Sequence, residues 1–218
     1  MLSKKMHLVF LGAPGAGKGT MASMAAKKFN LSHLSTGEIL RQEIKKGSEL
    51  GLKVKKVVES GVLVNDELVA KILKENIKAS RKGFILDGYP RNLKQAEMLD
   101  KILAELKIDF LKAIFFEIEK EELVRRLSSR LYCSKCGATF NGYTESLKPK
   151  KEGKCDSCRA ELIKRKDDSV EVIEKRLGVY EEETKPLIDY YAKEGLLIKI
   201  NANKGIKENF SQLKKVLG

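Results

Sequence analysis

The sequence predicts an α/β fold in which a central parallel sheet is covered by helices on both faces. Short apolar runs alternate with longer amphipathic stretches, and a glycine-rich loop joins the first run to the first helix. Every cysteine lies within residues 133–158, which indicates a small inserted unit. A chain of 218 residues favours one main domain with inserts over two equal domains.

Four short apolar runs are expected to form the parallel sheet. Each is too short for a buried helix and too uniformly apolar for a half-exposed strand, so each reads as a strand buried on both faces. These runs are residues 7–11, 84–87, 112–118 and 196–200.

Amphipathic stretches between these runs predict the covering helices. Asn65 and Asp168 are placed to cap two of them, and Pro186 can open another after a break in the preceding helix. The side chains expected to share the buried face of the helix at residues 65–77 are Leu68, Ile72 and Leu73. The predicted helices are residues 20–29, 65–77, 93–106 and 121–130, one after Asp168, one from Pro186, and one at the C-terminus.

Two stretches depart from this alternation and are predicted to be inserts. Residues 35–61 are polar and helical, and Gly47 and Gly51 are expected to break them into shorter helices. The segment at residues 131–166 holds all the cysteines and many short polar residues, which indicates a small separate module.

Composition limits the classes of function. With 42% hydrophobic and 33% charged residues, the chain resembles a globular protein. No apolar run approaches the roughly 20 residues of a membrane helix, and the N-terminus does not resemble a signal peptide, so a cytoplasmic protein without a membrane partner is expected. The net charge of +13 indicates anionic partners, either nucleic acid or nucleoside phosphates, unless it reflects only lysine-rich solvated helices.

The loop after the first strand has the composition of a phosphate-binding loop. In Gly12-Ala-Pro-Gly-Ala-Gly-Lys-Gly-Thr20, the glycines let backbone N–H groups approach phosphate oxygens, and the next helix adds the positive end of its dipole. Lys18 can bridge the β- and γ-phosphates. The general pattern has Ser or Thr directly after the lysine, whereas here Gly19 precedes Thr20, which argues against direct Mg²⁺ ligation by that hydroxyl.

Asp87 and Arg91 indicate a second group of site residues at the same edge of the sheet. Asp87 ends the second strand, at the carboxyl edge where open α/β sheets bind ligands. A carboxylate there suits Mg²⁺, held through water. The turn that follows is expected to direct Arg91 back toward the loop.

These motifs resemble the adenylate kinase family, and the resemblance covers essentially the whole chain in order. The motifs are GAPGAGKGT, Ser35-Thr36-Gly37 followed by Arg41, DGYPR followed by Gln95, the pair Arg126 and Arg130, Arg165-Lys-Asp-Asp168, and Arg176. Two positions depart from the common pattern, because Glu38 stands where many relatives carry Asp and Tyr89 where many carry Phe.

The resemblance implies a P-loop three-layer fold with a central parallel sheet and two inserts. The core would comprise residues 1–34, 65–128 and 169–218. A helical insert that binds the nucleoside monophosphate would comprise residues 35–64, and a zinc-binding lid would comprise residues 129–168. It also implies reversible, Mg²⁺-dependent phosphoryl transfer from ATP to AMP, giving two ADP, with the lid closing over ATP and excluding water.

The resemblance also implies which residues contact each nucleotide. The expected ATP contacts are Gly15, Ala16, Gly17, Lys18, Gly19, Thr20, Arg130, Thr139, Phe140 and Lys204. The expected AMP contacts are Thr36, Arg41, Val62, Leu63, Val64, Gly88, Tyr89, Pro90, Arg91, Gln95, Arg165 and Arg176. The Gln95 amide would read the adenine ring, and Phe140 would either stack on the ATP base or pack in the core of the lid.

Arginines are expected to do most of the catalytic work. Phosphoryl transfer needs alignment and positive charge around three oxygens, and arginine offers a permanent charge with a bidentate fork. Arg126 and Arg130, four apart in a predicted helix, are expected to share one face. Because the attacking phosphate is already an anion, no general base is needed, and His7 and His33 are expected to be structural. The expected catalytic residues are Lys18, Asp87, Arg91, Arg126, Arg130, Arg165 and Arg176.

The four cysteines form two Cys-x2-Cys pairs, a pattern typical of a structural Zn²⁺ site. Their clustering in a chain expected to be intracellular favours metal over disulfides, and iron is the alternative metal. A closed site of this kind would hold together an insert with little core of its own. The expected ligands are Cys133, Cys136, Cys155 and Cys158.

Two rival functions stay open. One is a kinase for another monophosphate, such as UMP or CMP, or one that uses GTP as donor. The other is a zinc-ribbon, nucleic-acid-binding NTPase, in which the net charge and the aromatic and basic residues within residues 131–166 would form the binding face. The leading hypothesis is a monomeric enzyme with ATP and AMP as its ligands.

Overall fold

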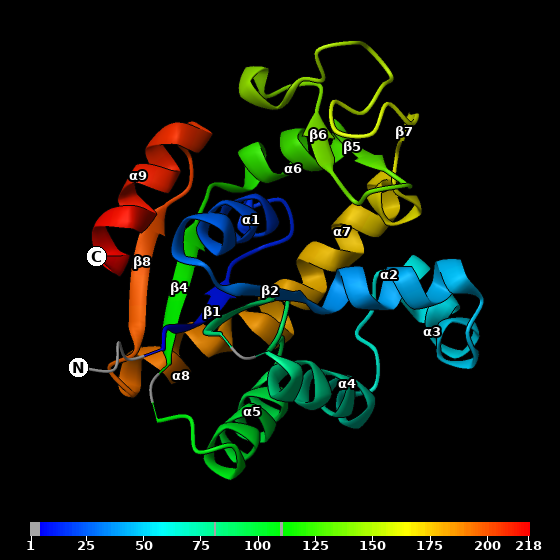
Figure 1. The fold of residues 1–218 in the computed structure, drawn as a ribbon. Helices are drawn as coiled ribbons and strands as arrows, with labels where there is room; N and C mark the ends of the chain where they lie inside the picture. The colour runs from blue at the N-terminus through cyan, green and yellow to red at the C-terminus, as the bar shows by residue number, and fades with distance from the viewer. Residues whose placement is uncertain (1–4, 81, 110) are drawn as a thin grey trace.

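A five-stranded, fully parallel sheet forms the centre of the molecule (Figure 1). The computed structural model describes residues 5–80, 82–109 and 111–218. The strands are β1 His7–Leu11, β2 Ser32–Ser35, β3 Phe84–Asp87, β4 Lys112–Glu117 and β8 Leu197–Asn201. Their order in the sheet is β2-β3-β1-β4-β8. This architecture confirms the predicted α/β fold.

Helices cover both faces of the sheet and make a three-layer arrangement (Figure 1). The helices are α1 Lys18–Phe29, α2 Thr36–Lys46, α3 Glu49–Glu59, α4 Asp66–Ala79, α5 Leu93–Glu105, α6 Lys120–Ser128, α7 Val170–Val179, α8 Pro186–Lys193 and α9 Ile206–Leu217. Alternate residues of β1 face opposite sides of the sheet: Leu8 and Phe10 pack under α1 and α9, whereas Val9 and Leu11 pack under α4, α5 and α8.

The segment between β2 and α4 is helical as predicted, but one of its two glycines does not break it. Gly47 ends α2 with a φ of 66°, as expected. Gly51 instead lies inside α3, where a Cβ atom would meet the carbonyl oxygen of Glu43 at 2.1 Å. The prediction of a break at Gly51 is wrong, because this glycine is needed for the close crossing of α2 and α3. Strand β2, at the start of this segment, was not predicted.

The helix expected at residues 121–130 ends earlier than predicted. It ends at Ser128, and Arg130 begins β5 (Arg130–Cys133). β5 is the middle strand of a small antiparallel sheet, between β6 (Thr139–Asn141) and β7 (Leu162–Ile163). The prediction that Arg126 and Arg130 share a helix face is therefore wrong, because pairing of Arg130 with Asn141 draws the chain into this sheet.

Two helix caps were predicted, and one of them is correct. The Asn65 side chain accepts a hydrogen bond from the N–H of Leu68 and begins α4. Asp168 does not cap α7, whose cap position is Ser169, but forms ion pairs instead. Pro186 opens α8 as predicted, although the chain passes from α7 into α8 through a π-helical segment, Tyr180–Thr184, and not through a break.

The buried face of α4 is partly as predicted. Leu73 is fully buried, but Leu68 and Ile72 are only half-buried. The other buried residues of this helix are Val69, Ala70 and Ile77. The face is rotated from the predicted one because α4 packs against both the sheet and α5.

Two segments project from the sheet on its carboxyl side (Figure 1). One is the α2–α3 hairpin, residues 36–59, and the other is the cysteine segment, residues 129–168, which holds β5, β6 and β7. Within the described parts of the chain, no helix combines the length and apolar character needed to cross a membrane.

Candidate active site

A cavity of about 540 Å³ lies at the carboxyl ends of the parallel strands. The phosphate-binding loop after β1 and Asp87 at the end of β3 line it from the sheet side. Residues of the α2–α3 hairpin, the cysteine segment, α7 and the loop before α9 also line it. Strands, helices and both projecting segments therefore meet at one site. The sequence predicted that Asp87 would lie beside the loop at this edge of the sheet, and it does.

The phosphate-binding loop adopts a conformation that requires glycine. Gly15 has a φ of 90°, and a Cβ atom there would lie 2.9 Å from the Leu127 side chain. Gly17, with a φ of 88°, precedes the first turn of α1. Lys18 extends back over the loop, and its Nζ donates hydrogen bonds to the carbonyl oxygens of Gly12 at 2.6 Å and Ala13 at 3.0 Å.

The Lys18 ammonium has an unusual electrostatic environment. Burial lowers its pKa to about 8, and the nearby arginines add to the shift, whereas Asp87 opposes it. An anion bound beside Lys18 would reverse this effect, because it would stabilise the charged ammonium. The loop therefore favours an anionic ligand.

Gly19, which departs from the general loop pattern, has a structural explanation. A Cβ atom at this position would lie 3.3 Å from Oδ2 of Asp87. The α1 backbone and the Asp87 carboxylate thus approach more closely than a Ser or Thr side chain at position 19 allows without a shift. Thr20, one residue later, lines the same cavity.

Asp87 is half-buried and receives a hydrogen bond that the sequence did not predict. Nε2 of His33 lies 3.2 Å from its Oδ2, and Nδ1 of His33 lies 3.5 Å from the Ser23 hydroxyl. Burial alone would raise the pKa of Asp87, but the His33 hydrogen bond and the charges of Lys18 and Arg91 lower it below its ordinary value. His33, expected to be structural, lines the cavity beside Asp87.

Arg130 and Arg176 converge on one carboxylate, that of Asp168. Nε of Arg130 lies 2.7 Å from Asp168 Oδ2, and its Nη2 also pairs with the same carboxylate. Nη1 of Arg176 lies 3.0 Å from Asp168 Oδ1 and 3.2 Å from Asp167 Oδ2. The cysteine segment and α7 are thereby joined where both meet the cavity.

The remaining arginines line the same cavity from other elements. Arg126, on α6, donates from Nε to Glu122 at 2.8 Å and from Nη2 to the carbonyl of Ala202 at 3.0 Å. Burial and nearby arginines lower the pKa of Arg91 to about 10 and that of Arg165 to about 9. Both values leave the guanidinium groups charged near neutral pH, so the cavity is strongly cationic.

A smaller recess opens beside the main cavity, between the α2–α3 hairpin and α5. Several residues line both spaces, so the two are adjacent: Gly37, Arg41, Gly88, Arg91 and Arg176. The expected AMP contacts that line the recess are Thr36, Arg41, Val62, Leu63, Val64, Gly88, Arg91, Gln95 and Arg176.

Three expected AMP contacts lie elsewhere. Tyr89 is fully buried in the core between the sheet and α4, and neither it nor Pro90 lines either space. Arg165 lines the main cavity, where its Nη2 lies 3.5 Å from the Thr139 hydroxyl.

The expected ATP contacts of the cysteine segment do reach the main cavity, with Thr139, Phe140 and Lys204 all among its lining residues. Phe140 is only 8% exposed and also packs in the small core of the cysteine segment with Cys133 and Leu162. The two roles considered for Phe140 are therefore both compatible with its position.

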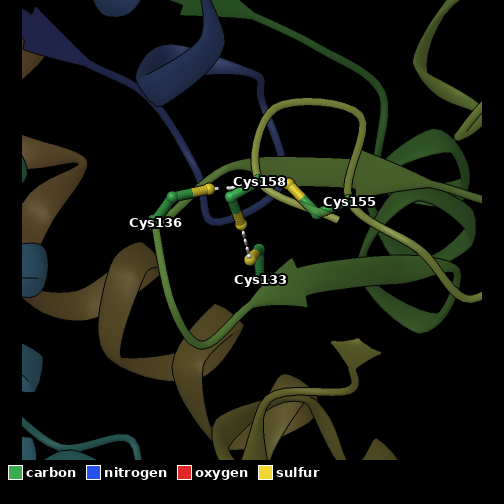
Figure 2. Close-up of side chains that lie close together, drawn as sticks. All are labelled: Cys133, Cys136, Cys155 and Cys158. Carbon is green, nitrogen blue, oxygen red and sulfur yellow. Dashed lines mark hydrogen bonds between the residues drawn. The ribbon is translucent and has the colours of Figure 1, made fainter. Parts of the chain in front are cut away.

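The four cysteine sulfurs form a compact cluster (Figure 2). All lie within 4.8 Å of one another, with 3.4 Å between Cys133 and Cys158 and 3.5 Å between Cys136 and Cys155. Four thiol groups at these separations match a tetrahedral thiolate site such as that of zinc. The cluster ties the turn after β5 to the loop before β7, so a metal here would hold the cysteine segment together.

Comparison with known proteins agrees with this geometry. The family model described as "Adenylate kinase" matches residues 10–196, most of the chain. The chain belongs to the adenylate kinase family. As a member it is a phosphotransferase, as the motifs predicted.

Individual adenylate kinases are similar over nearly their whole length. One from Caldanaerobacter subterraneus is 47% identical over 214 residues, which cover 97% of this chain and 96% of that protein. One from Carboxydothermus hydrogenoformans is also 47% identical, over 97% of this chain and 99% of its own length. One from Methanothrix thermoacetophila is 47% identical over 97% of this chain and 98% of its own length. The family likeness therefore includes both projecting segments.

Proposed function

We propose that this protein transfers a phosphoryl group reversibly between ATP and AMP, giving two ADP, and so maintains the balance of adenine nucleotides. The observation that carries the proposal is that two adjacent spaces share their cationic lining. The main cavity holds the phosphate-binding loop, the recess lies against α5, and Arg91 and Arg176 face both. A donor in one and an acceptor in the other would place their phosphates between these arginines.

The reaction follows from charge and alignment. Lys18 would hold the β- and γ-phosphates of ATP, Arg41 and Arg91 would orient the AMP phosphate, and the other arginines would stabilise charge on the transferred group. The AMP phosphate attacks as an anion, so no side chain has to remove a proton. The residues proposed to stabilise the moving group are Lys18, Arg126, Arg130, Arg165 and Arg176.

The Asp87 carboxylate fits a role in holding Mg²⁺ through water. It is half-buried, its pKa is lowered, and it lies against the first turn of α1 next to the phosphate-binding loop. Bound Mg²⁺ would supply charge neutralisation for the ATP phosphates. His33 would hold Asp87 in position for this role.

We also propose that the two inserts move relative to the core. The core is residues 1–34, 65–128 and 169–218, the AMP-binding insert is residues 35–64, and the zinc lid is residues 129–168. Nζ of Lys45, on α2, donates a hydrogen bond to the Ser134 carbonyl, between the first two cysteines, at 2.7 Å. This contact supports closure of both inserts over the nucleotides, which would exclude water from the reaction. A monomeric state and a cytoplasmic location accompany this proposal as predictions.

A panel of monophosphates tests the proposal. With ATP and Mg²⁺, we expect fast ADP formation with AMP and a much slower reaction with GMP and UMP. A coupled assay of ADP measures these rates. Preferred use of UMP or CMP, or of GTP as the donor, would overturn the assignment. For the nucleic-acid alternative, binding of DNA or RNA that persists at about 150 mM salt would count in its favour.

A further inference from the structure

The Gln95 side chain is held from two sides at the wall of the recess. It lies in the first turn of α5, is 2% exposed and lines the recess. Its Oε1 accepts a hydrogen bond from the backbone N–H of Arg91 at 2.8 Å. Its Nε2 donates to Oδ1 of Asp66, on α4, at 2.7 Å. Both ends of the amide therefore have a fixed partner.

The chemistry of these partners allows only one orientation of the amide. A backbone N–H can only donate a hydrogen bond, and a carboxylate can only accept one. If the amide were turned over, its NH2 group would face the Arg91 N–H and its oxygen would face the Asp66 carboxylate. Both contacts would be lost, and a buried polar group without a partner is strongly unfavourable.

Asp66 is itself fixed, and it does not line the recess. It is the first residue of α4, where the helix dipole favours a negative charge. Nδ2 of Asn92 also donates to its Oδ1 at 3.3 Å, and Nζ of Lys94 lies 4.0 Å from its Oδ2. Any influence of Asp66 on a bound base therefore passes through Gln95.

The fixed amide leaves one N–H donor and one oxygen lone pair for a ligand. The Watson–Crick edge of adenine offers the matching pair, an acceptor at N1 and a donor at the N6 amino group, and cytosine offers the same pattern at N3 and N4. Guanine and uracil present the reverse, a ring N–H beside a carbonyl oxygen. They would pair only with the amide turned over.

We propose that Asp66 is a positioning residue for base selection: it locks the Gln95 amide in the orientation that accepts adenine or cytosine and rejects guanine or uracil. This inference rests on the proposed function, in which the recess holds the acceptor monophosphate. Adenine is then separated from cytosine by the size of the recess, and from guanine by the orientation of the amide.

The test compares Asp66→Asn with Asp66→Ser, since an Asn amide or a Ser hydroxyl can either accept from or donate to the Gln95 amide. With saturating ATP and Mg²⁺, we expect the ratio of kcat/KM for AMP to kcat/KM for GMP to fall about tenfold in both variants, the scale of one hydrogen bond. The change should lie in the KM values, with kcat for AMP and KM for ATP near wild type. The Arg91 N–H still favours the original orientation, so selectivity should fall and not vanish.

Glu67→Gln is the matched control, because Glu67 is the exposed neighbour of Asp66 and its carboxylate pairs with the exposed Lys94 at 2.6 Å. Its AMP to GMP ratio should stay at the wild-type value. An unchanged ratio in a folded Asp66 variant would overturn the inference. A wild-type enzyme that prefers GMP or UMP would instead overturn the proposed function, so the two failures are distinguishable.

Discussion

Arg91 is the side chain on which both halves of the site depend. It lines the main cavity and the recess, and its Nε donates to the Gly88 carbonyl at 2.9 Å, which fixes the guanidinium group at their junction. We expect Arg91→Ala to lower kcat/KM more than about tenfold, or ~1.4 kcal/mol or more of transition-state stabilisation. Steady-state kinetics checks this. Arg125→Ala, which removes an exposed arginine of α6, should have little effect, and wild-type kinetics in Arg91→Ala would refute its role.

The pKa of Lys18 predicts a pH dependence of ATP binding. Because burial lowers this pKa to about 8, the free enzyme loses the ammonium charge as the pH rises through that value. We expect ATP affinity to weaken on the alkaline side, since the deprotonated amine no longer attracts the phosphates. Calorimetric titration of ATP across this range measures the effect. Lys18→Arg, whose charge persists, should show a flatter profile, and an equally steep one would argue against Lys18 as the titrating group.

At this scale the sequence predicted which side chains of local motifs the structure brings together, but not a contact between distant segments. Asp87 and Arg91, which line the cavity, and the four clustered cysteines were identified because each belongs to a short motif. The His33 contact with Asp87 depends on the pairing of β2 with β3, which places His33 opposite Ile85. No local sequence pattern predicted that pairing, because β2 is short and half-polar.

Among the elements, the α2–α3 hairpin depends on one glycine. A Cβ at position 51 would clash with the Glu43 carbonyl, so Gly51→Ala should push the two helices apart and cost about 1 to 3 kcal/mol of unfolding free energy. Gly178→Ala is the matched control, since that position in α7 has open space for a Cβ, and it should stabilise by up to about 1 kcal/mol. Urea unfolding measures the free energy of unfolding of both variants and the wild type. A Gly51→Ala variant as stable as the wild type would contradict the close crossing of α2 and α3.

The cysteine segment is expected to depend on metal. We expect about one zinc per chain by elemental mass spectrometry, and a lower melting temperature for Cys155→Ser, because Cys155 is fully buried and its sulfur lies 3.5 Å from that of Cys136 within the cluster. Ser157→Ala, in the same loop, should retain the zinc and the wild-type melting temperature. Less than roughly half an equivalent of metal in carefully purified protein would contradict the site, and iron in its place would correct the choice of metal.

Element boundaries were predictable where a local signal exists and failed where pairing decides. Asn65 and Pro186 began helices as predicted, because capping and ring geometry act within one turn. The end of α6 was missed because Arg130 joins a strand whose partner, Asn141, lies in the cysteine segment. Asp168 looked like a cap from its position but is drawn to Arg130 and Arg176, which only the folded chain brings near.

For the whole molecule, the Lys45 contact with Ser134 links the two projecting segments. We expect Lys45→Ala to weaken closure and raise the KM for AMP a few-fold, with kcat less affected. Lys46→Ala is the matched control, because Lys46 pairs with Glu43 on its own helix. Fluorescence energy transfer between labels on α3 and the cysteine segment reports closure directly, and an unchanged closed fraction in Lys45→Ala would rule out this link.

The sharing of Asp168 by Arg130 and Arg176 has a practical consequence. Asp168 and Asp167 together can neutralise only Arg130 and Arg176, and Lys18, Arg41 and Arg165 add further positive charge to the same cavity. Inorganic polyanions such as pyrophosphate or sulfate will therefore settle there and compete with nucleotides. Affinities measured in phosphate buffer should then come out weaker than in a zwitterionic buffer, and the choice of buffer becomes part of any measurement on this enzyme.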